Sequence, residues 1–575
     1  MADRPDRVAA VARGFRQSYL RHDELTAQLQ AWAKAFPELV RLRSIGKSPE
    51  GRDLWVLIVG RDPEALRPAA WVDGNMHATE VCGSSVALAI AEDALRVHLG
   101  ETLPHLSRAA TEALRDLHLY VLPRMSPDGA EAVLSSRRYV RSSPLDARQH
   151  KQHARWESRD LDGDGRILII RQQSPEGELV ELPGFPGVLV PRLPDDDGPF
   201  YRVYPEGVIA NFDGRTIPDP HFLSDNQYDF NRNFPYSWAP EPEQEGAGDY
   251  PGSTPETKAV LDFVTSRPNI FAWMNLHTFG GVFIRPLGHS PDSKMNQGDL
   301  AVFRQVEEWA KEFTTYPTVS GFHEFLYEPE RPLKGDLTDF AYHQRGCVAY
   351  VVELWDVFRR IGMEVKKPFV DHYSRMTRKD FAALATFDRD VNKGRIFLPW
   401  KKTTHPQLGE IEVGGLDILV GISNPPYEIL PETCTQQSAA YLRVAALLPR
   451  PAIEIVAHEQ LAEDVTRVTV RVVNKGYLGT TGLPSAAKLP HVEPLRLDWE
   501  AGPGVKVEAP ATGNVGLGHL EGWGQGLYGG TSIFTPWSRG NPHEKFVSVV
   551  TRGHGALKLR VSSCRIGTFT VTVEV

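Results

Sequence analysis

The sequence predicts an α/β domain with a mixed sheet and large insertions, followed by an all-β sandwich. Short apolar runs typical of buried strands alternate with helical patterns of apolar residues through most of the chain. Near residue 450 the pattern changes, and apolar and polar residues then alternate with period two between Gly, Pro and Asn turns. We therefore expect an α/β domain over 1–450, insertions at about 144–225 and 360–425, and a β-sandwich over 451–575.

The composition is typical of a soluble protein of two or three domains. Hydrophobic residues make up 41% and charged residues 24% of the 575 residues. The formal net charge of −9 argues against a nucleic-acid-binding surface. No apolar run is long enough to cross a membrane and no apolar signal segment is visible, so we expect a cytoplasmic protein, or a secreted one if a leader was removed. The four scattered cysteines predict neither disulfides nor a cysteine-ligated metal.

The first elements are a helix and a hairpin. Apolar residues at helical spacing predict helix over about 5–35, and Pro37 ends it. The strand-like runs 40–45 and 54–59 are joined by a loop that contains Gly and Pro, which is typical of a hairpin.

The stretch 71–95 is the centre of the prediction. It begins as an apolar strand, passes His77 and Glu80, and continues as a helix rich in Ala, Val and Leu. Ligands bind at the carboxyl ends of strands in open α/β sheets, and an imidazole and a carboxylate three residues apart can bind one zinc ion. Alone, such a pair is more often a helix cap or a solvated turn.

The remaining α/β elements follow the same alternation. We expect helices over 107–116, 298–313 and 433–448, and strands over 117–122, 271–275 and 348–354. The two insertions break this rhythm, and we expect irregular structure there with only short β-like runs.

Further polar residues follow apolar strands. His277 follows one strand, and Glu353 ends another. A carboxylate that closes a buried strand is costly unless it is paired or has a chemical task, such as general base beside metal-bound water. Arg232 can hold a carboxylate through two parallel hydrogen bonds, and an arginine near the metal can stabilise an oxyanion. Each residue alone has a plainer explanation, as a satisfied strand-end side chain or a solvated charge.

Six segments occur in a defined order along the chain. They are GKSPEGR (46–52), MSPDGAE (125–131), RYVRS (138–142), DFNRN (229–233), NLH (275–277) and TDFAY (338–342) with Glu353 after it. Together with His77 and Glu80 they resemble the motifs of the zinc carboxypeptidase family, the funnelin type that includes carboxypeptidases A, B and T. The resemblance covers roughly residues 15–450 and implies the mixed-sheet fold of that family, a Zn²⁺ cofactor and removal of C-terminal residues from peptides.

The resemblance also implies roles for the residues around the metal. His77, Glu80 and His277 would bind zinc. Glu353 would be the general base and would later deliver the proton to the leaving amine. Arg141 would polarise the scissile carbonyl and hold its oxyanion.

Other matched residues would bind and orient. Asn231 and Arg232 would clamp the free C-terminal carboxylate of a peptide substrate, and Arg138 would line the outer subsites. Tyr327 is the candidate for the mobile tyrosine of the family that covers the substrate. Asp229 would orient His77, since zinc-bound imidazoles usually donate their other N–H to a carboxylate or carbonyl.

The chain departs from the family pattern in three places. The spacing from Glu80 to His277 is longer than usual, and the first insertion accounts for the excess. Tyr327 lies too far before Asp339 for a gapless match. The position that sets specificity in the family corresponds to Thr338, which is neither acidic nor large and apolar, so the preferred C-terminal residue stays open.

An aspartate-rich loop lies inside the first insertion. Asp160, Asp162 and Asp164, with Gly165 at the sixth position, resemble the first half of an EF-hand calcium loop. Arg171 stands at the twelfth position, where the bidentate Glu should be, so a complete EF-hand is excluded. A Ca²⁺ site completed from elsewhere and a plain solvated turn are both compatible with this pattern.

Three functions are consistent with these patterns. The first is a zinc metallocarboxypeptidase acting on peptides. The second is an amidase of the same architecture that acts on peptidoglycan stem peptides or N-acyl amino acids. The third is a catalytically silent binding protein, although all three ligands and Glu353 are present. The sequence does not indicate the oligomeric state.

Overall fold

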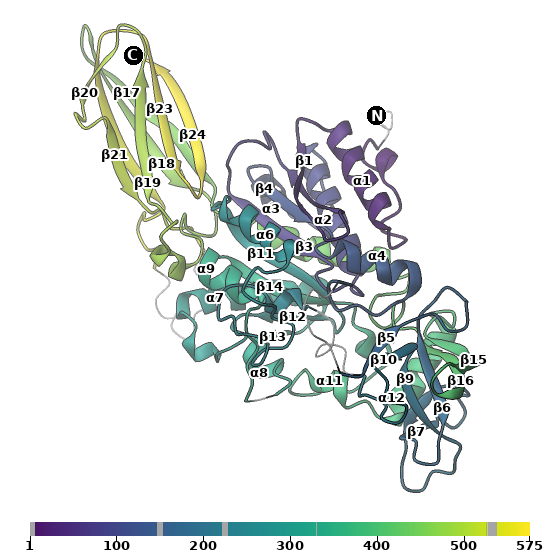
Figure 1. The fold of residues 1–575 in the computed structure, drawn as a ribbon. Coiled ribbons are helices and arrows are strands. Elements are labelled where there is room, and N and C mark those ends of the chain that lie inside the picture. Colours follow the sequence, from purple (N-terminus) through teal and green to yellow (C-terminus); the bar gives the residue numbers. More distant parts are fainter. Residues whose placement is uncertain (1–5, 146–152, 221–227, 329, 525, 527–536) are drawn as a thin grey trace.

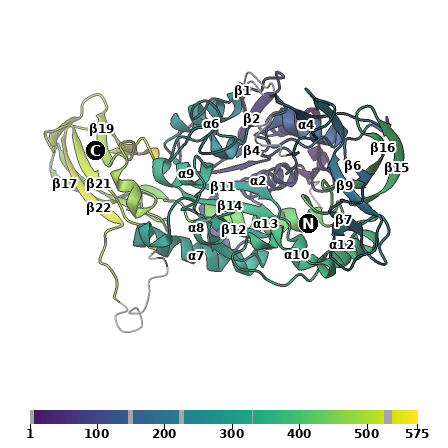
Figure 2. The same cartoon turned by 60° about the horizontal axis from the view of Figure 1, so that its bottom comes forward.

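Residues 6–145, 153–220, 228–328, 330–524, 526 and 537–575 are described in the computed structural model. An α/β domain occupies the middle of the molecule (Figure 1). The β-rich C-terminal part lies at one end, and the insertions lie at the opposite end (Figures 1 and 2).

The α/β domain is built on an eight-stranded mixed sheet. In spatial order the strands are β1 (Val40–Lys47), β2 (Asp53–Val59), β4 (His118–Leu122), β3 (Ala69–Gly74), β11 (Ile270–Thr278), β14 (Val348–Leu354), β12 (Val282–Arg285) and β13 (Thr318–Ser320). Neighbours from β4 to β14 are parallel, whereas β2 and β12 join this parallel core as antiparallel neighbours. The predicted mixed sheet is confirmed.

Helices cover both faces of the sheet. The longer ones are α1 (His22–Ala35), α2 (Cys82–His98), α3 (Arg108–Leu114), α4 (Pro127–Ser136), α6 (Pro255–Thr265), α7 (Gln297–Thr314), α9 (Leu337–Arg345) and α13 (Leu430–Ala445). Helix α12 (Arg378–Asp390) belongs to the second insertion and packs against strands of the first, and the short helices of the described chain are α8 (Gly321–Glu324), α10 (Val357–Arg360) and α11 (Asp371–Ser374). Ala70 and Val72 of β3 pack into the core that contains residues of α1, α2, α7 and α13, whereas Ala69 and Trp71 pack into the core with α6 and α9. Burial on both faces explains why the strands read as continuous apolar runs. Within the described residues, none of these helices is long and apolar enough to span a membrane.

The N-terminal helix is shorter than the predicted 5–35. Among the described residues before α1, from residue 6 onward, the only helical element is the 3₁₀ turn η1 (Ala9–Val11). Gly14 has a φ of +78°, a left-handed conformation that interrupts a right-handed helix. Val8 and Phe15 are nevertheless fully buried, so the apolar residues that suggested a helix serve the core from an irregular segment.

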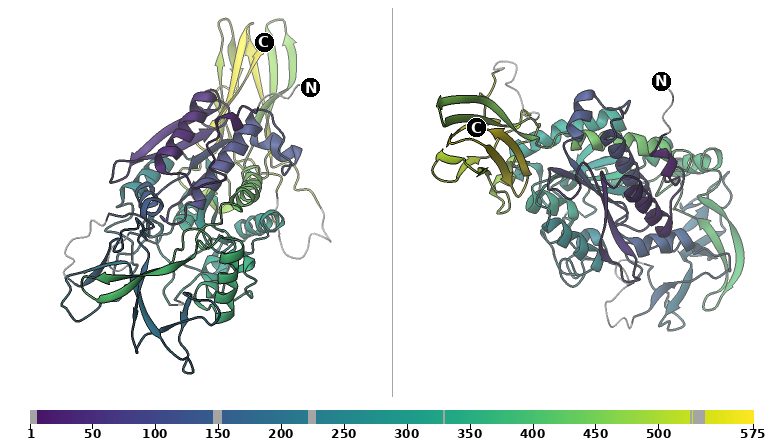
Figure 3. Two further views of the ribbon diagram at one scale, coloured as in Figure 1. Left: turned by 90° about the vertical axis from the view of Figure 1, so that its right-hand side faces the viewer. Right: turned by 90° about the horizontal axis from the view of Figure 1, so that it is seen from above.

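The two insertions fold together into one six-stranded sheet. Its strands, in spatial order, are β15 (Phe397–His405), β16 (Gly409–Leu416), β6 (Ile169–Gln173), β9 (Phe200–Pro205), β7 (Leu179–Glu181) and β8 (Leu189–Pro191); β5 (Arg155–Ser158) pairs separately with β10 (Gly207–Ala210). Antiparallel pairing of β16 with β6 joins the second insertion to the first, and their green and blue strands lie side by side (Figure 3). The expectation of irregular structure is therefore wrong. Local sequence could not show this sheet, because its central pairing joins segments that are far apart in the chain.

Arg171 lies at the centre of the insertion sheet. Its side chain is only 7% exposed, and its guanidinium lies 4.4 Å from the ring centroid of Tyr201 and 4.5 Å from that of Trp400. It donates to Glu412 and Glu181, both at 2.7 Å. The residue that disqualified an EF-hand thus connects five strands, because these partners lie on β9, β15, β16 and β7.

Beyond residue 450 the chain forms two four-stranded antiparallel sheets. One contains β17 (Pro451–Ala462), β18 (Val465–Asn474), β22 (Glu544–Arg552) and β20 (Lys506–Ala509), and the other β21 (Asn514–Gly518), β19 (Leu495–Ala501), β23 (Ala556–Ser563) and β24 (Gly567–Glu574). Val470 of β18 and Leu559 of β23 are fully buried in one cluster. This arrangement is consistent with the predicted β-sandwich.

Arg565 fastens this C-terminal part to the α/β domain. Its side chain is fully buried and donates to the carbonyls of Arg345 and Gly346, both at 3.0 Å. The guanidinium also lies 4.3 Å from the ring centroid of Phe271, on strand β11, which carries His277 near its end. Burial lowers the pKa of Arg565 to about 10.

We expect Arg565→Met to lower the free energy of unfolding by about 2–4 kcal/mol, because it leaves two buried carbonyl groups without donors. Chemical denaturation would measure this loss. Arg560→Met is the matched control, because the guanidinium of Arg560 pairs with Asp498 on a partly exposed strand and should contribute less than about 1 kcal/mol. Equal effects of the two substitutions would contradict the fastening role.

Candidate active site

Two parallel strands bring three potential metal ligands to one edge of the central sheet. Strand β3 ends just before His77 and Glu80, and β11 carries His277 next to its last residue. Because β3 and β11 are parallel neighbours, their carboxyl ends meet. All three side chains are buried, and together they form a group that could hold a metal ion.

The potential ligand atoms converge on one point. Nδ1 of His77 lies 2.8 Å from one oxygen of Glu80, and Nδ1 of His277 lies 3.0 Å from the other. The two Nδ1 atoms are 3.0 Å apart. Against the effect of burial, the two histidines lower the pKa of Glu80 well below its ordinary value, so the carboxylate is ionised. Two imidazoles and a carboxylate are a donor set that suits a catalytic zinc ion.

Polar side chains hold the outer nitrogen of each histidine. Nε2 of His77 lies 3.0 Å from Asp229, the residue to which the family resemblance assigns the orienting role. Nε2 of His277 lies 2.5 Å from the side-chain oxygen of Asn275, a contact that the sequence analysis missed. Both rings are thereby fixed with Nδ1 turned toward the potential metal position.

A buried carboxylate lies behind Asn275. The amide of Asn275 donates to Asp73, which also accepts from the indole N–H groups of Trp71 and Trp273, both at 2.7 Å. Burial raises the pKa of Asp73 to about 6. The sequence does contain a signal for this pair. Asp73 and Asn275 are polar residues within apolar strands, and they stand at paired positions of β3 and β11 in the sheet.

Glu353 lies beside the ligands on the next strand. The parallel register of β11 and β14 pairs it directly with His277. Its Oε2 is buried and has no hydrogen-bond partner among the described residues. Burial raises the pKa of Glu353 to about 8, with His277 opposing the shift and Glu80 adding to it. A carboxyl group with a free oxygen and a pKa near neutrality suits proton transfer.

Arg141 is held close to the ligands, whereas Arg138 is not. Arg141 donates from Nε to Asp229 at 3.0 Å, and its Nη1 lies 3.8 Å from Glu80. Although burial opposes it, the charge of Asp229 raises the pKa of Arg141 above its ordinary value. Arg138 does not line the cavity described below, so its part in outer subsites stays a prediction.

Asn231 and Arg232 lie on the short 3₁₀ turn η2 (Phe230–Arg232), which Asp229 caps. The side-chain oxygen of Asn231 accepts from the amide of Leu337, and Nη1 of Arg232 donates to the carbonyl of Asn231. Among the described residues, no carboxylate forms an ion pair with Arg232. Its guanidinium is therefore available for an anionic ligand.

These side chains surround a cavity of about 110 Å³. The residues lining it that the sequence predicted are His77, Arg141, Asn231, Arg232, His277, Tyr327 and Glu353. Tyr327 lines the cavity although its spacing from Asp339 differs from the family pattern, and its side chain is 63% exposed. Arg285, Asp336 and Asp339 also line it and were not singled out as ligand-binding residues by the sequence.

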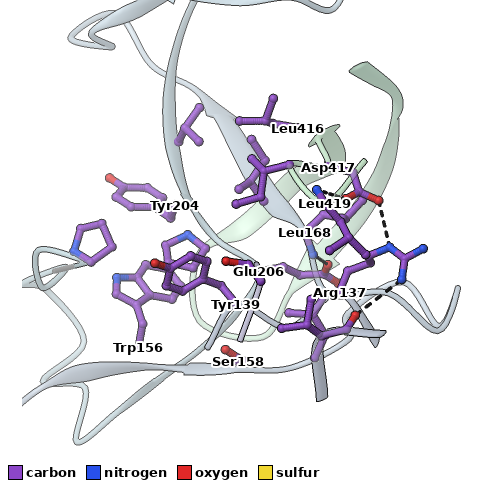
Figure 4. A pocket seen from close by; sticks show the side chains of 18 residues that line it. Arg137, Tyr139, Trp156, Ser158, Leu168, Tyr204, Glu206, Leu416, Asp417 and Leu419 are labelled. Carbon is purple, nitrogen blue, oxygen red and sulfur yellow. Dashed lines mark hydrogen bonds and ion pairs between the residues drawn. The ribbon is translucent and has the colours of Figure 1, made fainter. Parts of the chain in front are cut away.

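A second, larger cavity of about 400 Å³ lies between the insertion sheet and the α/β domain (Figure 4). Its wall is mainly apolar and includes Trp156 and Tyr204, whose rings stack with centroids 5.3 Å apart. Thr79 and Tyr139 also line it. Thr79 directly precedes Glu80 in the chain, but none of the three potential metal ligands lines this cavity.

The aspartate-rich loop is closed mainly by its own backbone. Asp160 accepts from the amides of Gly163 and Gly165, and the carboxylate of Asp162 lies 3.2 Å from Lys401. Asp160, Asp162 and Glu206 form a group that could hold a cation, and Asp164 does not belong to this group. Both oxygens of Glu206 accept backbone amides, and calcium binding stays a prediction.

Two family models match the chain. Residues 25–165 and 211–374, more than half of the chain, match the model described as zinc carboxypeptidase. Residues 450–574 match a domain of unknown function, DUF8731.

Curated relatives match over limited lengths. Carboxypeptidase N catalytic chain of Homo sapiens is 33% identical over 114 residues, which are 19% of this chain and 24% of that relative. Carboxypeptidase D of Mus musculus is 34% identical over 388 residues, which are 64% of this chain and 21% of that relative. The chain thus spans about a quarter or less of the length of these relatives.

Solved structures match more broadly but distantly. Thrombin activatable fibrinolysis inhibitor matches over 76% of both chains, with 15% identity and a TM-score of 0.43. Carboxypeptidase A from Helicoverpa armigera matches over 66% of this chain and 74% of its own, with 18% identity and a TM-score of 0.40.

Proposed function

Because the chain belongs to the zinc carboxypeptidase family, we propose that it is a zinc-dependent metallocarboxypeptidase that hydrolyses the C-terminal peptide bond of peptides. One observation carries the proposal. Three potential zinc ligands converge, and two of them, His77 and His277, line one cavity together with Glu353 and Arg232. Among the described residues, Glu353 has an oxygen without a hydrogen-bond partner and Arg232 forms no ion pair.

We assign the zinc ion to His77, Glu80 and His277. Three protein ligands with an open fourth position are usual for catalytic zinc. The donor set fits, because Asp229 and Asn275 already engage the outer histidine nitrogens and leave Nδ1 of each ring for the metal. Zinc, when bound, supplies a Lewis acid that polarises a carbonyl and lowers the pKa of water.

The other residues supply proton transfer, charge stabilisation and binding. Glu353 takes the proton of the attacking water at its free oxygen and passes it to the leaving amine. Arg141, held by Asp229, stabilises the negative charge that develops on the scissile carbonyl oxygen. Arg232 and Asn231 hold the terminal carboxylate of the substrate, which restricts cleavage to the last peptide bond.

A panel of N-blocked dipeptides, each with a free or an amidated C-terminus, would test this function. We expect release of the last residue from the free acids only. A chelator should abolish turnover and added zinc should restore it, because the metal ligands are all side chains of the site. Release would be followed by chromatography.

Other outcomes point to the alternatives. Equal cleavage of amidated substrates would remove Arg232 from the carboxylate clamp and indicate an amidase. Absence of turnover on these dipeptides and on peptidoglycan stem peptides, with zinc shown to be bound, would indicate a binding protein.

The cavity of Figure 4 favours a second candidate, an amidase that acts on N-acyl amino acids. This cavity has a volume of about 400 Å³ and a mainly apolar wall, and one of its lining residues, Thr79, precedes Glu80 in the chain. It would accept an acyl chain on the N-terminal side of the scissile bond. The same panel decides between the two when it includes N-dodecanoyl amino acids. A kcat/KM higher for these than for peptides would favour the amidase.

A further inference from the structure

A second group of potential metal ligands lies beside the catalytic cavity. His289, Asp339 and His343 each offer one ligand atom, and these atoms lie within 4.8 Å of one another. The group has the same composition as the proposed zinc ligands, two imidazoles and one carboxylate, but it shares no residue with them. Asp339 also lines the catalytic cavity, so the second group borders that cavity.

Two segments far apart in the chain bring the three side chains together. Asp339 and His343 stand four residues apart on α9, and side chains at this spacing lie on the same face of a helix. His289 lies in the segment that follows β12, and its Nδ1 is 2.7 Å from Oδ2 of Asp339. The backbone amide of Gly288 donates to the same carboxylate. The carboxylate is therefore held at the point where the two segments meet.

The ring of Tyr236 orients both imidazoles. It stacks on His343 with centroids 3.9 Å apart and 11° between the planes, and it lies edge-on to His289 at 5.3 Å. Nε2 of His343 is buried and has no hydrogen-bond partner among the described residues. Buried polar atoms are rarely left unsatisfied. An ordinary ion pair would explain the contact of His289 with Asp339, but it would give no role to this nitrogen.

The surrounding charges favour a cation. Asp336 and Asp339 are 9% and 1% exposed, and a Cβ on Gly288 would lie 3.4 Å from an oxygen of the first and 3.7 Å from an oxygen of the second. Among the described residues, His289 is the only basic side chain that forms an ion pair with either carboxylate. Arg285, which also lines the cavity, is engaged by two other carboxylates. A divalent ion would balance the charge of the two neighbouring buried carboxylates.

We propose that His289, Asp339 and His343 bind a second zinc ion. Two imidazoles and one carboxylate are a donor set that zinc uses, with a fourth position left to water. The side chain of His289 is 22% exposed, which gives the ion a path from solvent. The ion would join the segment after β12 to α9 and so fix the part of the cavity wall that Asp339 forms. Its role is structural, and the inference does not depend on the proposed function.

Zinc content and zinc titration would test this site. After gel filtration to remove loosely bound metal, we expect two zinc ions per chain in the wild type and one in His343→Gln, measured by elemental analysis. In a calorimetric titration of the metal-free protein with Zn²⁺, the substitution should weaken one of two binding events by about 100-fold or more. Loss of an outer partner of a ligand already costs about 10–100-fold in metal affinity, and loss of a ligand itself should cost at least as much.

Two further variants separate metal binding from folding. His289→Gln lies outside α9 and should give the same result as His343→Gln, so a local defect of that helix could not explain both losses. His323→Gln is the matched control, because His323 lies on α8, which begins beside Gly288, and belongs to no group of potential ligands among the described residues. It should keep both zinc ions. Two zinc ions retained in His343→Gln would overturn the inference.

His277→Gln distinguishes this inference from the proposed function. His277 belongs to the other ligand group, so this variant should lose the ion of the proposed catalytic site and keep one zinc ion, which additional substitution of His343 should remove. That result would support the second site even if no peptide were cleaved. If the wild type cleaved free-acid dipeptides but His277→Gln contained no zinc, the proposed function would stand and the second site would be rejected.

Discussion

Glu353→Gln is expected to reduce kcat by about 10³-fold on free-acid dipeptides, because general-base catalysis typically contributes 10²–10⁴-fold. Glutamine keeps the size of the side chain and can still fill the site beside His277, but it cannot accept the proton of the attacking water. The zinc content should stay at the wild-type value, since Glu353 is not among the assigned ligands. Steady-state kinetics and elemental analysis would measure both quantities.

Glu256→Gln is a close control for this experiment. Glu256 is also buried, has an oxygen without a partner among the described residues, and has a pKa that burial raises to about 8. It lies in the first turn of α6, away from the cavity lining. If Glu256→Gln lowered kcat as much as Glu353→Gln, the loss would reflect burial of a carboxyl group and not proton transfer.

Arg232→Met is expected to lower kcat/KM for free-acid dipeptides by about 10²-fold or more, because loss of one partner from a buried charge pair costs about 2–5 kcal/mol. Amidated dipeptides lack the carboxylate and should keep the negligible rate that they have with the wild type, so the difference between the two substrate types should shrink. Comparison of kcat/KM on matched acid and amide pairs would measure this change.

Arg138→Met serves as the control for the clamp. Arg138 carries the same charge but does not line the catalytic cavity, and a dipeptide is too short to reach outer subsites. Its kinetics on the acid and amide pairs should match the wild type. A persistent preference of Arg232→Met for free acids would show that another group binds the terminal carboxylate.

The central part of the site could be predicted from the sequence. His77, His277 and Glu353 each follow or end an apolar run, and parallel neighbouring strands bring such positions to the same edge of a sheet. Position along the chain therefore translated directly into proximity in space. Tyr327 also reached the cavity, although its spacing differed from the family pattern.

Other parts of the site depend on contacts that no local pattern encodes. Asn275 holds His277 because its side chain points along the same strand toward the ring, between two apolar layers. One oxygen of Asp336 caps the helix, and the other has no partner among the described residues because Asp336 lies in a loop that packs on Arg232. The identity of a residue shows that it can bind a cation, but only its surroundings show whether it already has a partner.

The shared insertion sheet also constrains how this chain could have evolved. Loss of the second insertion alone would expose the backbone edge of β6 and remove Glu412 from the buried guanidinium of Arg171. Loss of the first insertion alone would leave the hairpin β15–β16 without a sheet to join. Either half alone would lose the contacts of the shared sheet, so we expect the two segments to be inherited as a pair: ancestors and descendants of this protein should carry both or neither.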